Sequence, residues 1–249
     1  MSADEIMKNY WGGMSEDFSD VVKNEISTEI GKIWEDVLSD NLPKNNNLEI
    51  LDVGCGPGFF GIILSRLGYS VTEADYNEKM LGRAKENIKK YGKEPLVSYR
   101  VMSAAPLEYN DCAFDVVISR NVTWNLPDPQ AAYKEWMRVL KPGGIIMNFD
   151  ANWFLHYFDT EAKKDWERGE QLVEASGFVL RKDDKEKCIV DSIKEMPLTK
   201  IRRPEWDVGI LDKYNAKDIR TRQLPSEIYD EYYRLLYNYI PTFMIYAQK

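Results

Sequence analysis

The stretch Glu49-Ile50-Leu51-Asp52-Val53-Gly54-Cys55-Gly56-Pro57-Gly58 decides which fold this chain is expected to adopt. Its first half is apolar and mostly branched, as in a parallel strand that is covered on both faces. Gly54, Gly56 and Gly58 lack Cβ atoms, so the backbone can turn sharply and a ligand can approach it closely. Phe59 to Leu67 follows as a predicted helix, whose first turn directs free N–H groups toward that ligand. The stretch therefore predicts a strand, a ligand-binding loop and a helix.

A second predicted strand indicates that the ligand is a nucleoside. Tyr69 to Asp75 ends in an acid about 20 residues after the loop, where a carboxylate is expected to bind both ribose hydroxyls of a nucleoside cofactor. Dinucleotide folds space their glycines as G-x-G-x-x-G to seat a pyrophosphate. The spacing here is G-x-G-x-G, and Asp52 before it would repel a pyrophosphate but suits a ligand that carries positive charge. S-adenosylmethionine (SAM) has a sulfonium and an ammonium group and no phosphate, so it fits this loop.

The loop resembles motif I of the class I SAM-dependent methyltransferases, in the form common to the small-molecule group that includes the ubiquinone and menaquinone methyltransferases. Later segments resemble the same family in order, closely over residues 46–152 and more loosely over the last 45 residues. Phe114 to Ser119 resembles the fourth strand, Leu140 to Gly144 the turn before a fifth strand at Ile145 to Phe149, and Pro241 to Ala247 the last strand. The resemblance implies a Rossmann-like, doubly wound α/β fold. Its seven-stranded sheet is expected to be mostly parallel, with an antiparallel last strand.

The resemblance also implies which residues contact the cofactor. Ser103 stands where the family often has an acid bonded to the adenine amino group, and a neutral hydroxyl holds that hydrogen bond more weakly. Tyr10 and Trp11 resemble an aromatic pair that closes over the cofactor, although core packing would also explain them. The expected cofactor-binding residues are Asp52, Gly54, Cys55, Gly56, Gly58, Asp75, Tyr76, Met80, Ser103, Ala104, Arg120, Asn121, Tyr10 and Trp11.

The whole of residues 1–249 is expected to form one domain in four parts. Residues 1–43 are predicted to be a helical cap, and residues 44–152 alternate strand and helix as a SAM-binding core with a parallel sheet. Residues 153–203 break the alternation and are predicted to form a lid over the active site, although their charges also fit a solvated face. Residues 204–249 are expected to complete the sheet with a helix, a strand at Lys217 to Leu224, a tyrosine-rich helix at Pro225 to Tyr239 and the last strand.

Composition limits the partners of the protein. The net charge of −8 argues against a nucleic-acid substrate, because phosphate binding needs a basic surface. No apolar stretch approaches the roughly 20 residues of a membrane helix, and the acidic N-terminus has no apolar signal core. The three cysteines lack metal-type spacing, so no metal is expected. We therefore expect a cytoplasmic protein, a monomer or a homodimer, that binds a small-molecule acceptor and no membrane.

Methyl transfer from a sulfonium is an in-line displacement, and orientation of the reactants alone contributes on the order of 7–11 kcal/mol. In open α/β sheets the acceptor site lies beyond the carboxyl ends of the strands. His156, the single histidine, is a candidate general base because imidazole titrates near neutral pH, or else a lid histidine bonded to backbone. Asp150 is a second catalytic candidate, with a substrate anchor and a strand-end cap as alternatives. The predicted substrate pocket comprises Trp124, Trp153 and Tyr157, whose aromatic faces suit a flat or cationic acceptor.

The sequence thus predicts a SAM-dependent methyltransferase that acts on a small molecule. One alternative is another SAM-fold enzyme such as an aminopropyltransferase, although Ser119-Arg120-Asn121 lacks the paired acids that would hold a polyamine. A non-catalytic SAM-binding module is the other alternative. The sequence favours no particular acceptor atom among oxygen, nitrogen, sulfur and carbon.

Overall fold

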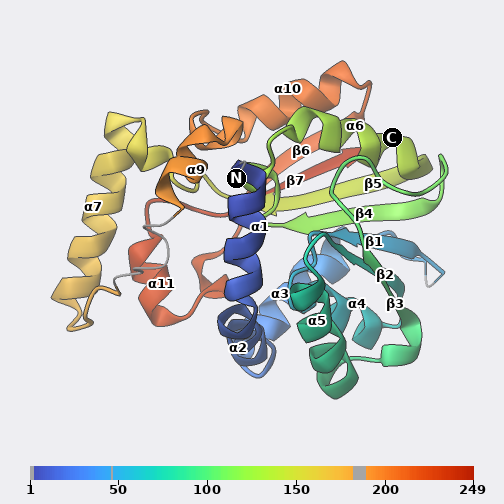
Figure 1. The fold of residues 1–249 in the computed structure, drawn as a ribbon, viewed down its shortest axis with the longest axis horizontal. Helices are drawn as coiled ribbons and strands as arrows, with labels where there is room; N and C mark the ends of the chain where they lie inside the picture. Colours follow the sequence, from blue (N-terminus) through green and yellow to red (C-terminus); the bar gives the residue numbers. More distant parts are fainter. Residues whose placement is uncertain (1–2, 46, 182–188) are drawn as a thin grey trace.

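The computed structural model describes residues 3–45, 47–181 and 189–249. Its seven-stranded sheet has the order β3-β2-β1-β4-β5-β7-β6 (Figure 1). The strands from β3 to β5 are parallel, and β7 runs antiparallel to both β5 and β6. The strands are β1 (Glu49–Val53), β2 (Ser70–Asp75), β3 (Val97–Val101), β4 (Phe114–Arg120), β5 (Leu140–Asp150), β6 (Lys217–Gln223) and β7 (Phe243–Gln248).

Helices cover both faces of this sheet. The α-helices are α1 (Ala3–Gly13), α2 (Ser15–Ile26), α3 (Glu29–Asn41), α4 (Phe59–Leu67), α5 (Glu78–Tyr91), α6 (Pro129–Val139), α7 (Thr160–Ala175), α9 (Val190–Glu195), α10 (Glu205–Lys213) and α11 (Glu231–Leu236). Short 3-10 helices are η1 (Glu94–Leu96), η2 (Thr123–Asn125), η3 (Leu155–Tyr157), η4 (Pro197–Thr199) and η5 (Ser226–Ile228). The strand order reverses between the parallel neighbours β1 and β4, which is where open α/β sheets bind ligands.

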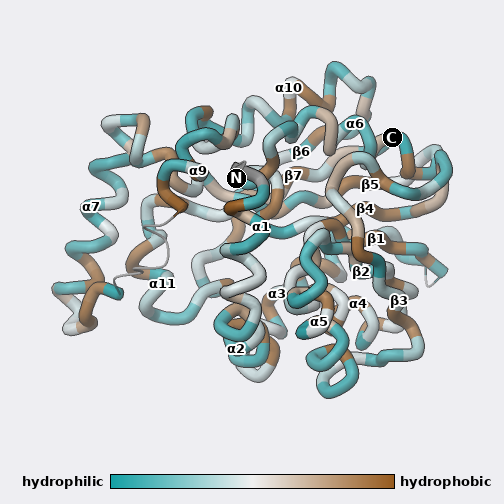
Figure 2. The backbone as a smooth tube through the Cα atoms, viewed as in Figure 1, coloured by the Kyte–Doolittle hydropathy of each residue, from teal (hydrophilic) through white to brown (hydrophobic). Residues whose placement is uncertain are grey.

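Two apolar cores, one on each face, hold the sheet between its helices. Ile50 faces a core that contains Trp34 of α3 and Ile62 of α4, whereas Leu51 faces a core that contains Tyr133 of α6 and Leu211 of α10. Successive residues of a strand point to opposite faces, so a strand that is buried on both must be apolar almost throughout. In Figure 2 hydrophobic stretches predominate along the central strands but are interrupted by polar residues, while the outlying α7 is largely hydrophilic.

The predicted fold class is confirmed, and the structure differs from expectation at two places, the start of β5 and the segment after Pro225. The predicted cap of residues 1–43 consists of three helices, α1, α2 and α3. The segment from Leu140 to Gly144 was expected to be a turn, but it is the irregular start of β5, where the register with β4 shifts. The predicted helix from Pro225 to Tyr239 is divided into η5 and the short α11.

The segment between β5 and β6 contains α10, which packs against α6, and two other groups of helices. On one side α7 packs against α11, and Gly169 permits the contact because a Cβ there would overlap the backbone carbonyl of Leu236. On the other side α9 and η4 lie against α1 and η2, at the carboxyl ends of the strands (Figure 1). The charged run predicted from Arg181 to Lys187, apart from Arg181 itself, and Cys188 lie outside the described residues.

In the part of the chain that the structure describes, no helix is both long enough and apolar enough to cross a membrane. The same residues contain no group of three or more His, Cys, Asp or Glu side chains arranged to hold a metal ion.

Candidate cofactor and acceptor sites

The glycine loop and the end of β2 form one hydrogen-bonded unit. The N–H groups of Gly54 and Cys55 donate to the carbonyl of Ala74, over 2.7 and 3.1 Å. The N–H of Gly56 donates to Oδ2 of Asp75 over 3.0 Å, and the N–H of Asn77 donates to Oδ1 over 2.8 Å. The predicted ribose acid is therefore fixed in position by the predicted loop.

The loop leaves room for a ligand at one of its glycines. All three predicted glycines have positive φ: +68° at Gly54, +53° at Gly56 and +85° at Gly58. A Cβ on Gly54 would overlap Val122, whereas a Cβ on Gly56 would meet no atom within 4 Å. Gly54 is thus needed for packing, and Gly56 faces open space beside Asp75. This arrangement fits a nucleoside whose ribose bonds the carboxylate.

Burial affects the charge of Asp75. Burial raises the pKa of its carboxyl to about 6, against the lowering effect of the N–H groups of Asn77 and Gly56. The carboxylate is the form that accepts hydrogen bonds from ribose hydroxyls. The site therefore holds its working charge state above pH 6.

Helix α1 covers this edge of the sheet. Asn77, which caps α5, donates through Nδ2 to the carbonyl of Lys8 over 2.8 Å. The ammonium of Lys8 lies 5.4 Å from the ring centre of Tyr76. Trp11 lies 5.1 Å from Tyr10 and 6.2 Å from Trp124 between ring centres, and its buried Nε1 has no hydrogen-bond partner. The predicted aromatic pair thus lies at the boundary between the loop and the strand ends.

The remaining predicted cofactor contacts occupy different environments. Asp52, Cys55 and Met80 are buried, while Ser103 is exposed at the end of β3. Ala104 is half-buried, and its carbonyl accepts a bond from Nε1 of Trp136 over 3.2 Å. Ser103 stays a predicted adenine contact and Ala104 a predicted cofactor contact, since both follow β3, the neighbour of the strand that ends in the predicted ribose acid Asp75.

The role predicted for the Arg120 side chain has to be corrected. Its guanidinium forms a bidentate pair with Glu25 of α2, over 2.7 and 2.9 Å, and is not free to bind a ligand. It also stacks 4.8 Å from the ring of Trp34 and 4.4 Å from that of Phe59. Although desolvation opposes its charge, the Glu25 carboxylate raises the pKa of Arg120. Arg120 therefore ties the helical cap to the end of β4.

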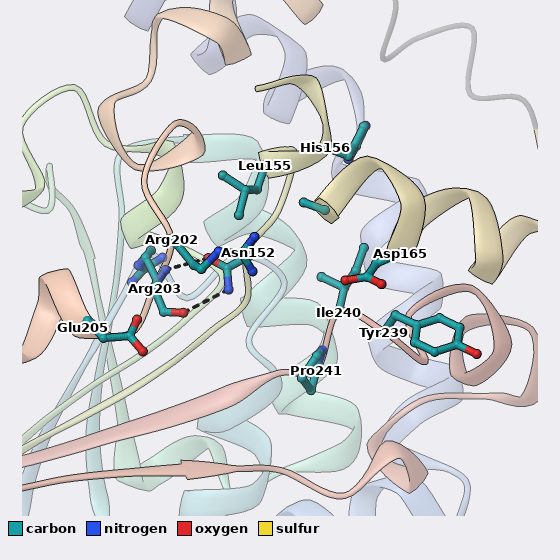
Figure 3. A pocket seen from close by; sticks show the side chains of 11 residues that line it. Asn152, Leu155, His156, Asp165, Arg202, Arg203, Glu205, Tyr239, Ile240 and Pro241 are labelled. Atoms are coloured by element: carbon teal, nitrogen blue, oxygen red, sulfur yellow. Dashed lines mark hydrogen bonds between the residues drawn. The ribbon is translucent and has the colours of Figure 1, made fainter. Parts of the chain in front are cut away.

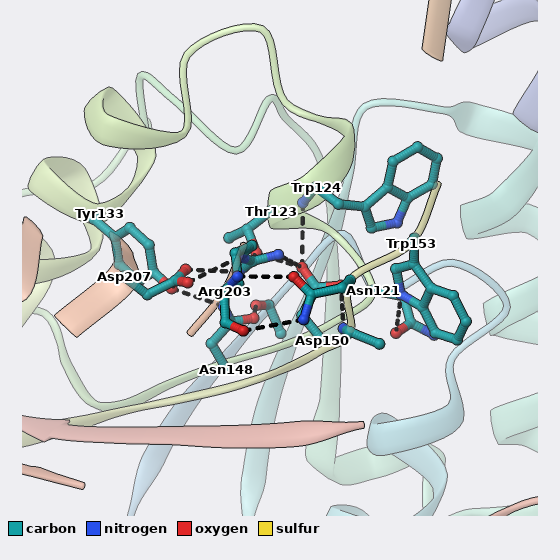
Figure 4. A network of polar contacts seen from close by, with 12 residues as sticks. Asn121, Thr123, Trp124, Tyr133, Asn148, Asp150, Trp153, Arg203 and Asp207 are labelled. Carbon is teal, nitrogen blue, oxygen red and sulfur yellow. Dashed lines mark hydrogen bonds and ion pairs between the residues drawn. The ribbon is translucent and has the colours of Figure 1, made fainter. Parts of the chain in front are cut away.

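The catalytic role predicted for Asp150 is corrected for a similar reason. The carboxylate of Asp150 is fully buried and accepts bonds from Nη1 of Arg203 (2.6 Å) and from the hydroxyl of Thr123 (2.5 Å) (Figure 4). Its Oδ2 also accepts from the N–H of Trp124 over 3.2 Å. A carboxylate that is fully buried and held by these donors has no access to an acceptor, so Asp150 fits the strand-end cap that the sequence left as an alternative.

The Arg203 network connects the lid segment to the core. Besides Asp150, the Arg203 guanidinium binds Asp207 of α10 over 2.6 and 2.8 Å. Asp207 accepts from the hydroxyl of Tyr133, and the main chain of Arg203 is hydrogen-bonded in both directions to the side chain of Asn152. The two turns that follow β4 and β5 are thereby fixed to each other.

Both of these turns contain a residue with strained backbone. Asn121 has φ +58° and Phe154 has φ +64°, in the left-handed region that L-residues seldom adopt. The indole Nε1 of Trp153 donates to Oδ1 of Asn121 over 3.3 Å. Such strain clusters at ligand sites because packing around the site maintains it. Trp153 is half-buried, whereas Trp124 is almost fully buried in an apolar cluster and acts there as a core residue.

His156 lines a pocket of about 290 Å³ next to the end of β5 (Figure 3). Its ring stacks on Trp166 at 4.4 Å between centres, and Nδ1 is buried without a hydrogen-bond partner. Burial lowers the pKa of His156 to about 4, so the imidazole is neutral near pH 7. Asp165, Glu205 and Tyr239 also line the pocket. Tyr157 contacts the His156 ring but is itself exposed.

Comparison with known proteins identifies the part of the chain that carries this site. Residues 51–148 match the family model described as "Methyltransferase domain". They resemble a methyltransferase domain. The match begins in β1 and ends in β5, so it includes the glycine loop and Asp75. The chain resembles the class I SAM-dependent methyltransferases, as its sequence predicted.

Relatives and solved structures agree with this assignment. The demethylmenaquinone methyltransferase of Staphylococcus aureus is 35% identical over 131 residues, which cover 51% of this chain and 53% of the relative. A SAM-dependent methyltransferase from Aquifex aeolicus has the same fold at a TM-score of 0.57 and 19% identity, over 92% of this chain and 97% of that one. Phosphoethanolamine N-methyltransferase 2 of Haemonchus contortus, in complex with SAM, gives a TM-score of 0.60 at 19% identity, over 86% of this chain and 51% of that one. The aligned region spans about half the length of the curated relative.

Sequence reasoning missed two buried charged residues, Glu73 of β2 and Arg203 of the segment after β5. Glu73, two residues before Asp75, points to the same face of β2 and is fully buried. The sequence did contain an indication of its special position, because an acid inside a strand that is expected to be covered on both faces is unusual. The local sequence around Arg203 did not indicate its buried ion pair, because its partner Asp150 lies 53 residues earlier in the sequence.

Proposed function

We propose that this protein transfers a methyl group from SAM to a small-molecule acceptor. The observation that carries the proposal is the glycine loop hydrogen-bonded to Asp75, with open space at Gly56. The net charge of −8 favours a small molecule over a nucleic acid. A cytoplasmic location and a monomeric or homodimeric state stay predictions from the sequence.

The residues around the loop would hold SAM. The Asp75 carboxylate would bind the ribose, and the backbone of Gly54 and Gly56 would lie along the cofactor. Helix α1 would cover the cofactor with Tyr10 and Trp11. SAM would supply a methyl group already activated as a sulfonium. The protein therefore mainly has to orient the acceptor and exclude water. Orientation of the reactants can lower the activation free energy by about 7–11 kcal/mol.

The acceptor would approach from the turns after β4 and β5. Asn121 and Trp153 join these turns, and the pocket beside His156 opens next to them. The pocket is lined by two acids, Asp165 and Glu205, and by two arginines, Arg202 and Arg203, so its acidic and basic groups are equal in number. The rings of His156 and Tyr239 also line it, and aromatic faces suit a flat or cationic acceptor. His156 is the proposed general base because its buried Nδ1 has no hydrogen-bond partner and the ring lines this pocket, while its pKa of about 4 makes it a weak base at neutral pH. Residues 153–203 would form part of the acceptor site, and residues 1–249 would form a single domain.

Calorimetric titration with SAM and with S-adenosylhomocysteine (SAH) tests cofactor binding. The variant Asp75→Ala should bind either ligand about 10²-fold more weakly or worse, because hydrogen bonds to a charged group contribute about 1.5–3 kcal/mol each. Asp111→Ala, which alters an exposed acid far from the loop, serves as the control. Full binding by Asp75→Ala would refute the assignment.

Turnover is tested separately with a mixed panel of amine, phenol, thiol and carbon-acid acceptors, with products detected by mass spectrometry. We expect methylated product from cationic or flat members of the panel. Tight cofactor binding without product from any member would instead favour a non-catalytic SAM-binding module.

A further inference from the structure

Two carboxyl groups lie side by side beneath the glycine loop. Asp52 of β1 and Glu73 of β2 are register partners in the parallel sheet, so their side chains leave the same face of neighbouring strands. Asp52 is 2% exposed and Glu73 is fully buried. Asp75 follows on the same face of β2, and the thiol of Cys55 adjoins the pair. Three acids are therefore gathered within one small volume of the core.

Glu73 occupies a place that does not suit a charged group. Its side chain points beneath α4, where a Cβ on Gly61 would overlap its carboxyl group and where Ile88 of α5 is also close. Neither of its oxygens has a hydrogen-bond partner of ordinary geometry. An isolated carboxylate in such a place is strongly unfavourable, whereas a protonated carboxyl can donate its proton to Asp52.

The charged groups around the pair do not neutralise it. On β4, Arg120 acts on Asp52 but is bonded to Glu25, and on α1, Lys8 acts on Asp75. On β3 the buried Tyr99 hydroxyl has no hydrogen-bond partner, and Lys85 of α5 lies over the Tyr99 ring. Among the ion pairs of the described residues, none includes Asp52, Glu73 or Asp75.

These surroundings determine the protonation of the free protein. Burial raises the pKa of Asp52 to about 8. Burial, followed by the repulsion of Asp52, holds the pKa of Glu73 well above its usual range. At neutral pH the pair therefore carries at least one proton.

We propose that the Asp52–Glu73 pair exchanges a proton for the positive charge of SAM, and that it thereby distinguishes SAM from SAH. The inference rests on the proposed function, since it requires SAM to bind at the Gly54–Gly58 loop. When SAM binds, the proton shared by the two carboxyls leaves for solvent, and the second carboxylate charge is balanced by the sulfonium. After methyl transfer the electron pair of the broken C–S bond stays on sulfur, the product is a neutral thioether, and the pair takes a proton back.

The exchange has a consequence for product release. Because SAH lacks the sulfonium, its binding should leave the shared proton in place. The ratio of SAM affinity to SAH affinity should therefore increase with pH, by at most about tenfold per pH unit while one proton separates the two complexes. Glu73 would then be a residue that reduces product inhibition without touching the acceptor.

Calorimetry in buffers of different ionisation enthalpy counts the protons exchanged on binding. For the wild type near pH 7 we expect SAM to release about one proton more than SAH does. Glu73→Gln removes one of the two titrating carboxyls, so the difference should become smaller and the affinity ratio should change less steeply from about pH 6 to pH 8.5. Glu78→Gln, an exposed acid on α5, is the matched control and should behave as the wild type.

The outcomes separate this inference from the proposed function. If SAM does not bind the wild type, the proposed function fails and this inference fails with it. If both ligands bind with equal proton counts, the inference alone is overturned, and it is likewise overturned if Glu73→Gln keeps the wild-type difference. Should Glu73→Gln not fold, the wild-type comparison of SAM with SAH decides by itself.

Discussion

Replacement of the Arg203 side chain should lower the free energy of unfolding more than replacement of any other single side chain. Its guanidinium is fully buried and binds Asp150 and Asp207 at 2.6 Å each, with a further bond to Thr123 at 2.7 Å. Arg203→Met keeps the length of the side chain but leaves two buried carboxylates without a counter-charge. Removal of one partner of a buried ion pair costs about 3–5 kcal/mol. For a chain of this size that corresponds to a Tm lower by roughly 6–20 °C.

Urea unfolding followed by tryptophan fluorescence measures this loss, and the neighbouring residue provides the control. Arg202 also pairs with an aspartate, Asp159, but the pair is exposed to solvent. Arg202→Met should therefore change the free energy of unfolding very little. In the Arg203→Met background, Asp150→Asn and Asp207→Asn together should restore part of the stability, because they remove the uncompensated charges. A loss below about 1 kcal/mol for Arg203→Met, or one equal to that of Arg202→Met, would refute the reasoning.

Three further predictions follow from single positions. Gly169→Ala should lower the free energy of unfolding in urea by about 1–3 kcal/mol through overlap with the Leu236 carbonyl, while Gly209→Ala, in open space on α10, should not. Gly56→Ala should introduce roughly 1–2 kcal/mol of backbone strain. Measured by calorimetry, it should also weaken SAH binding about tenfold or more, because its methyl group would enter the space proposed for the cofactor. Unchanged SAH affinity would argue against cofactor binding at this glycine. The pKa of Asp52 is raised from 3.8 to about 8, so its protonated form contributes a stability that is fully present below pH 3.8 and is lost progressively as the pH rises through 8. Urea unfolding should therefore show less stability at pH 8 than at pH 6, with a smaller difference for Glu73→Gln; equal pH dependence in both proteins would contradict this.

The sequence by itself determined the fold and the cofactor side of the site. The apolar run of β1, the glycines after it and the acid at the end of β2 are local patterns, because strand, turn and helix form among near neighbours in the chain. Loop and carboxylate meet because parallel neighbouring strands bring their carboxyl ends together, which the order of elements alone implies. The local rules were less successful where a pattern was mixed, as at the irregular start of β5 and in the divided segment after Pro225.

Tertiary structure alone decided what the charged side chains do. Arg120 and Asp150 have the residue types of a binding site, yet their partners Glu25 and Arg203 lie 95 and 53 residues away. Whether a charge is available to a ligand depends on the groups that surround it after folding, and local sequence does not encode distant partners. The same holds for Glu73, which only the pairing of β1 with β2 places beside Asp52. The sequence thus specified where a ligand would bind, and the packed structure decided which charges remain there to meet it.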